Sequence, residues 1–225
     1  MTTKRSTVLA LAVALAATAA CSGCQVFAAG LAMAFPEEKV PAEFELPDAK
    51  SSKVLIFADD MFNPISYPPA KRALTEKMNQ ILIEKQLAAE VIPYDRLRDL
   101  ETAEPDFNRL AVSTVGKRLG ADLVIYVLLN PLSLKDNPAD SFWRGRFSGR
   151  VRVVDTHQRR RIWPEESAGR EIKVLEPQTE NSSPTYDRDL ALKLGEHMGV
   201  AVAQLFHVHY VDRAQPPQGR LDLAE

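Results

Sequence analysis

The feature that most constrains the fold is the apolar run at residues 121–129, ADLVIYVLL. Apart from Asp122 and Tyr126, all of its members are aliphatic. The run has the length of a strand and follows Gly120, a residue that commonly ends a helix. A strand with so few polar residues is typical of one buried on both faces. The run therefore predicts the central strand of a layered α/β protein.

Other short apolar runs predict further strands around this one. They lie at residues 54–57, 91–94, 161–163 and 172–174. Pro93 favours an edge position for the second of them, because proline cannot donate a hydrogen bond to a neighbouring strand.

Apolar residues at helical spacing predict three helices between and after these strands. The first begins at Pro68 and Pro69, the second is capped by Asp106 and ends at Gly120, and the third covers about residues 187–207. We therefore expect an α/β layered sandwich, with a mixed sheet of about five to six strands packed by helices. Residues 53–211 are expected to form this one domain, and residues 212–225 a flexible tail.

The N-terminus has the pattern of a secretory signal. Lys4 and Arg5 precede residues 8–20, thirteen residues without a charge. As a helix they would rise about 20 Å, short of a ~30 Å hydrocarbon core. The following Ala19-Ala20-Cys21 resembles the lipobox of bacterial lipoproteins, in which the cysteine is lipidated. We expect a signal peptide at residues 1–20 and lipidation at Cys21, with Cys24 as the alternative.

Lipidation would leave residues 21–52, which carry three prolines, as a linker between the membrane and the domain. Neither Ser22 nor Gln25 is the aspartate that retains lipoproteins of well-studied Gram-negative bacteria at the inner membrane. The resemblance therefore implies an anchor in the outer membrane, facing the periplasm. An ordinary secreted protein with two incidental thiols is the alternative interpretation.

Composition argues against several classes of protein. The chain of 225 residues has 28 basic and 30 acidic side chains, a net charge of −2, whereas a general nucleic-acid binder is usually strongly basic. Two cysteines cannot form a disulfide framework. No nucleophile or phosphate-binding motif is present, so we expect neither a catalytic site nor a cofactor.

Two weaker candidate sites remain. Asp59 and Asp60 follow a predicted strand, a common place for sites in α/β folds, and would be the centre of a hydrolase or metal enzyme. His207 and His209 would point about 200° apart on a helix, so we expect no zinc site there. We expect Asp59 and Asp60 to have a loop or capping role.

Alternation with a period of two at residues 143–153 predicts a strand with one basic face. More arginines follow at the next turn. Guanidinium groups bind carboxylates and phosphates, so these residues are candidates for binding an acidic partner or an anion. The alternative is a solvated face with Glu165, Glu166, Glu171 or Glu176 as cross-strand neighbours. The candidate residues are Arg144, Arg146, Arg150, Arg152, Arg159 and Arg160.

Three segments together resemble a group of envelope proteins. They are LGADLVIYVLL at 119–129, GRVRVVDTHQRRRIW at 149–163, and the end of the last helix at 204–206. The pattern is similar to that of the curli-secretion lipoproteins, the lipoprotein activators of penicillin-binding proteins and the amino-terminal domain of TolB. It departs from them at His157-Gln158, where the group usually has Thr-Gly, and no membrane-inserting hairpin is evident. The resemblance implies a non-catalytic domain that acts through protein–protein contacts.

The leading hypothesis is thus a lipid-anchored bacterial envelope protein that serves as an assembly or regulatory module, with another envelope protein as its partner. The alternative is a protein that binds an anionic cell-wall polymer or lipid headgroup through the arginine-rich strand.

Overall fold

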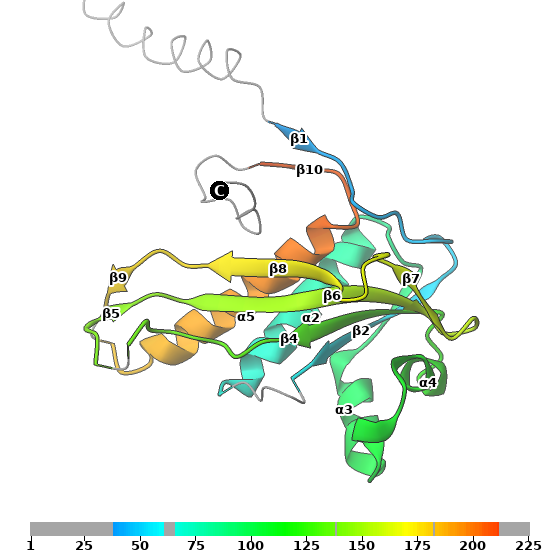
Figure 1. Ribbon diagram of the computed structural model, residues 1–225, viewed down its shortest axis with the longest axis horizontal. Helices are drawn as coiled ribbons and strands as arrows, with labels where there is room; N and C mark the ends of the chain where they lie inside the picture. The colour runs from blue at the N-terminus through cyan, green and yellow to red at the C-terminus, as the bar shows by residue number, and fades with distance from the viewer. Residues whose placement is uncertain (1–37, 61–65, 138, 182, 212–225) are drawn as a thin grey trace, which may run out of the picture. The chain divides into compact units, whose positions relative to one another are not determined.

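The computed structural model describes residues 38–60, 66–137, 139–181 and 183–211, which form a mixed six-stranded sheet with helices packed on it (Figure 1). The signal peptide, Cys21, Cys24 and the tail at 212–225 lie outside the described residues. The strands of the sheet are β2 (Lys53–Asp59), β3 (Glu90–Ile92), β4 (Leu123–Leu129), β6 (Arg146–Asp155), β7 (Arg160–Trp163) and β8 (Arg170–Leu175). The predicted α/β class and mixed sheet are confirmed.

The order of the strands is β3-β2-β4-β6-β7, and β8 also pairs with β6. β2 is parallel to both β3 and β4, whereas β6 is antiparallel to β4, β7 and β8. One edge of the long strand β6 bonds to β4. Its other edge is shared by β8, opposite residues 146–151, and by β7, opposite residues 153–155. As predicted, β4 is central and the Pro93 strand is at the edge.

Four α-helices occur in the described residues: α2 (Pro68–Glu84), α3 (Tyr94–Ala103), α4 (Val112–Arg118) and α5 (Tyr186–Gln204). A 3₁₀ turn, η1 (Phe107–Arg109), precedes α4. The short strands are β1 (Lys39–Val40), β5 (Phe142–Trp143), β9 (Thr179–Glu180) and β10 (His209–Tyr210).

The two faces of the sheet are covered differently. α2 connects β2 to β3, and α3 and α4 connect β3 to β4 on the opposite side of β2. Because such crossovers are right-handed, two connections that run in opposite directions place their helices on opposite faces. The strands after β4 are joined without a helix, and α5 returns to the face that α2 covers (Figure 1).

The core consists of two clusters that meet at β4. Ile125 and Val127 belong to the larger cluster, between the sheet and α2 and α5. Val124 and Tyr126 belong to the smaller one, against α3, η1 and α4. All four side chains are buried, so β4 is buried on both faces as its composition predicts.

Close packing of α2 against α5 depends on glycine. A Cβ atom on Gly195 would lie 2.3 Å from the carbonyl oxygen of Ala70, and one on Gly199 would lie 2.6 Å from that of Leu74. Real Cβ atoms essentially never come this close to another atom. The two helices therefore make backbone contact at these points, as a small residue every fourth position permits.

The predictions for residues 94–120 were partly wrong. Pro93 is followed by α3, a helix that the sequence reading missed because proline before a polar segment favours a turn. Asp106 does not cap a long helix: only η1 follows it, without a side-chain capping bond, and α4 begins at Val112. Gly120 ends that segment with φ +75°, as predicted.

Residues before β2 already pack on the sheet. Leu46 is buried in the larger core cluster, and the ring of Phe44 stacks on Trp163 at 5.6 Å. Both lie in the segment that the sequence reading assigned to the linker. Among the described helices, none combines the length and the apolar character needed to span a bilayer.

Asp122 joins two of the three segments that carry the family resemblance. Its Oδ2 accepts the Lys53 backbone N–H at 2.8 Å, and its Oδ1 lies 2.9 Å from Nε2 of His157. The hydroxyl of buried Thr156 donates to the Ala121 carbonyl at 2.7 Å. Residues 119–129 and the turn at 155–158 are thus bonded to each other, and the motif residues Asp122 and Thr156 are structural.

We predict that Gly195→Ala destabilises the protein by about 1–3 kcal/mol, because the added methyl group must push α5 away from α2. A helical Gly→Ala substitution without such a contact stabilises by about 1 kcal/mol. The sign of the change in urea unfolding therefore tests the contact. Glu196→Ala, at an exposed neighbouring position, is the control and should change stability by less than about 0.5 kcal/mol.

We also predict a pH-dependent effect of Asp122→Asn. The Lys53 N–H and then His157 hold the pKa of Asp122 below its usual range. The carboxylate therefore contributes stability above its unfolded pKa of about 3.9, and this is lost as the pH falls through the folded value. The variant should be about 1 kcal/mol less stable at pH 7, an effect kept small by partial exposure, and closer to wild type at pH 3. An equal difference at both pH values would contradict this.

Candidate functional site: an open, arginine-lined sheet face

The face of the sheet opposite α2 and α5 is only half covered by helices in the described part of the chain. α3, η1 and α4 cover this face over β2, β4 and the end of β6 at Val154, but not over β8 or the part of β6 that pairs with β8. Phe147, Val151 and Val153 point from β6 into the larger core cluster, so the alternate residues point to the uncovered side. Arg146 and Arg150 are exposed there, as the period of two predicts.

Arg150 and Arg152 lie at the middle of this open face. Arg150 is opposite Leu128 on β4 and Glu171 on β8, and it has no ion pair with any described residue. Arg152 is half-buried opposite Tyr126, and its Nη2 donates to the Ala168 carbonyl at 3.3 Å. Its buried Nε has no hydrogen-bond partner among the described groups. The exposed Arg150 guanidinium therefore retains donors that a ligand can use.

Arg144 and Arg146 are held by one carboxylate, Asp136. Nη2 of Arg146 lies 2.6 Å from Asp136 Oδ1, and Nη1 of Arg144 lies 3.2 Å from Oδ2. The prediction that Arg144 belongs to the same strand as Arg146 was wrong. Arg144 lies between β5 and β6, where its backbone N–H donates to the Leu134 carbonyl. The stripe of four arginines on one strand is therefore reduced to three, one of them neutralised from the loop.

Arg159 and Arg160 lie at the far end of β6, in and after the turn to β7. Arg159 has φ +54°, and Nε of Arg160 donates to Gln158 Oε1 at 2.5 Å. They form a second basic group, separated from Arg150 along the strand.

Of the four glutamates named as possible neighbours, only Glu171 lies opposite one of the β6 arginines, Arg150. Glu176 is buried, with Lys193 Nζ at 2.7 Å and His197 Nδ1 at 2.5 Å. Glu165 and Glu166 present their backbone carbonyls to the Arg161 guanidinium. Glu171 also lies 3.3 Å from Lys173 on the same face. The open face therefore has more positive than negative groups.

Asp59 and Asp60 have structural partners. The Tyr126 hydroxyl donates to Asp59 at 2.6 Å, and Lys71 Nζ lies 2.6 Å from Asp60. Burial, followed by this bond to Asp59, raises the pKa of Tyr126. A polar pocket of about 240 Å³ lies beside the two aspartates, yet the described residues contain no group of three side chains arranged to hold a metal ion.

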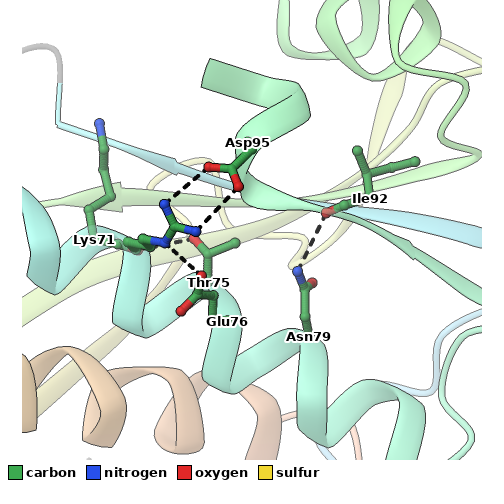
Figure 2. A network of polar contacts seen from close by, with 7 residues as sticks. Lys71, Thr75, Glu76, Asn79, Ile92 and Asp95 are labelled. Atoms are coloured by element: carbon green, nitrogen blue, oxygen red, sulfur yellow. Dashed lines mark hydrogen bonds and ion pairs between the residues drawn. The ribbon is translucent and has the colours of Figure 1, made fainter. Parts of the chain in front are cut away.

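Figure 2 shows how the neighbouring helices are joined. The Arg72 guanidinium bonds both oxygens of Asp95, at 3.1 and 3.2 Å, and also reaches Glu76. Asn79 donates to the Ile92 carbonyl at 3.4 Å. These contacts connect α2 to α3 and β3, so Arg72, Asp95 and Asn79 have structural roles.

Sequence reasoning missed Asp136 and Lys173. Asp136 comes from a loop whose approach to β6 no periodicity reveals. Lys173 lies on the exposed side of β8. Its alternation with the apolar Ile172 and Val174 could have predicted this exposure from the sequence.

No family model and no curated protein matches the chain. Its fold is similar to several solved structures. The PelC dodecamer from Paraburkholderia phytofirmans has 9% identity and a TM-score of 0.42, over 77% of this chain and 99% of that one. Lipoprotein GNA1162 from Neisseria meningitidis has 14% identity and a TM-score of 0.39, over 68% of this chain and 97% of that one. The LpoB C-terminal domain from Salmonella enterica has 11% identity and a TM-score of 0.31, over 61% of this chain and 88% of that one. Lipoproteins are thus among the structures with a similar fold, as the sequence resemblance implied.

Proposed function

We propose that this protein is a lipid-anchored bacterial envelope protein that acts as a non-catalytic assembly or regulatory module, binding an acidic partner protein through the open face of β6 and β8. The observation that carries the proposal is Arg150, which is exposed at the centre of that face without an ion pair among the described residues. Arg152 lies two residues further along the same side of β6 and adds a second positive charge.

The geometry of the face favours a protein surface as ligand. Arg150 and Arg152 project from a strand whose opposite side is packed in the core, so the backbone needs no ordering on binding. Leu128 and Leu175 add apolar surface beside the arginines, and Leu175 is 37% exposed. Arginine surrounded by partly apolar surface is typical of residues that dominate protein–protein binding energy.

The anchor is supported by the sequence of the N-terminus. A basic start, thirteen uncharged residues and Ala20-Cys21 follow one another in the order of a lipoprotein signal. Two or three acyl chains would hold the protein stably, since each buried CH₂ contributes about 0.8 kcal/mol. We place the anchor in the outer membrane, with the domain in the periplasm.

Metabolic labelling with palmitate tests the anchor. We expect the wild-type protein to be labelled, Cys21→Ser to lose the label and Cys24→Ser to retain it. The reverse pattern would assign the anchor to Cys24. Labelling that persists in the double variant would contradict lipidation at either cysteine.

An anionic polymer or lipid headgroup is the second candidate ligand of the same face. Alternate residues of a strand are about 6.8 Å apart, so Arg146, Arg150 and Arg152 form a linear array of positive charge. Such an array suits a chain of carboxylates or phosphates.

Charge reversal tests the face and separates the two candidates. We expect Arg150→Glu to abolish cross-linking to one defined envelope protein, because it places a carboxylate where the partner's acidic group binds. Arg109→Glu is the matched control, since Arg109 is 85% exposed and lies on η1. Loss of retention on anionic vesicles or cell-wall fragments, without a protein adduct, would favour the polymer. Equal behaviour of Arg150→Glu and wild type in both assays would rule out the face.

A further inference from the structure

β8 is a border strand of the sheet, and its outer side is unpaired. It pairs with β6 on one side, and no described strand pairs with it on the other (Figure 1). The border is six residues long, without proline or bulge. At the opposite border, β3 has only three residues and is followed at once by Pro93. β8 is thus the longer and less interrupted of the two borders, and the charges of Glu171 and Lys173 limit how another strand can pair with it.

The hydrogen-bond pattern of β6 determines which groups of β8 point outward. Arg146 exchanges backbone bonds with Ser133, and the Ser148 carbonyl accepts from Asn130, so these positions of β6 bond away from β8. The intervening positions of β6 bond to alternate residues of β8. The remaining residues of β8 direct their N–H and C=O groups outward: Glu171, Lys173 and Leu175.

These outward groups limit how a second copy can pair with β8. In an antiparallel pair, a two-fold axis at Glu171 would place two glutamates opposite each other, and an axis at Lys173 would place two lysines opposite each other. Like charges directly opposite are destabilising. An axis at Ile172 instead pairs Glu171 of each copy with Lys173 of the other, twice.

The register centred on Ile172 also satisfies the backbone. Glu171 and Lys173 are both residues with outward N–H and C=O groups, so each of the two pairs exchanges two hydrogen bonds. Ile172 faces its symmetry mate across a non-hydrogen-bonded pair, on the apolar side of the sheet. On the open face, Arg150, Glu171 and the partner copy's lysine form a row of alternating charge.

We propose that two copies of this chain associate through β8, antiparallel and centred on Ile172, so that their sheets become continuous. The interface is isologous, because the same strand is used by both copies. The inference stands on the strand border and its charges, and depends on neither lipidation nor the ligand of the open face.

Charge reversal with mixing tests this proposal. Glu171→Lys gives a border with two lysines, and Lys173→Glu gives one with two glutamates. Each variant alone should have a dimer dissociation constant raised on the order of tenfold or more, since both cross-pairs become repulsive. A mixture of the two should form a heterodimer, because every cross-pair is again of opposite charge. Sedimentation equilibrium of the purified full chain measures all four samples.

The expected result is a wild-type dimer, weaker self-association of each variant and recovery in the mixture. Far-ultraviolet circular dichroism establishes that the variants remain folded, and recovery in the mixture can only come from folded chains. A wild-type chain that stays monomeric, single variants that dimerise as tightly as wild type, or a mixture that does not recover would each overturn the proposal. Glu180→Lys, on β9 and eight residues beyond Ile172, is the control and should leave the dimer unchanged.

Discussion

The handedness of the two crossover connections determines which part of the sheet the described helices leave uncovered. The chain passes from β2 through α2 to β3 on one side of β2, and then through α3, η1 and α4 to β4 on the other side. Right-handed connections therefore put α2 on one face of the sheet and α3 and α4 on the opposite face. After β4 the chain adds β6, β7 and β8 without a helix between them, and β7 and β8 both pair with the same edge of β6. α5 then returns to the face of α2. Within the described residues, no helix therefore covers one half of the face opposite α2, and Arg146 and Arg150 lie on that half.

Packing on the side of the sheet covered by α2 and α5 fixes the backbone of β6 and thereby the direction of its residues on the opposite side. Gly195 and Gly199 let α5 come into backbone contact with α2, and both helices pack on the inner side of β6 and its neighbours. Phe147 and Val151 are held in that layer, which fixes the direction of the residues between them. Arg150 is thus oriented by the packing of its neighbours, without an ion pair of its own among the described residues. The backbone at Arg150 is therefore preorganised, while its exposed side chain would become ordered if a partner docked there.

The sequence predicts the parts of this arrangement that depend on hydrophobic pattern. The apolar run at 121–129 revealed the central strand, and alternation at 146–153 revealed the two faces of β6. Helix α3 was missed because half of its ten residues are charged and only Leu97 is buried. Long-range pairing has no local signal either: nothing in the sequence places Asp136 beside Arg146, or β8 beside β6 rather than beside β7.

Site-specific photo-cross-linking in living cells tests the central claim most directly. A photoreactive residue at Ser148 would lie on the open face between Arg146 and Arg150, and one at Arg109 would lie on η1. The account predicts a light-dependent adduct with one envelope protein from position 148 and none from position 109. Adducts from neither position, or the same adducts from both, would contradict the claim that the open half of the sheet is the binding surface.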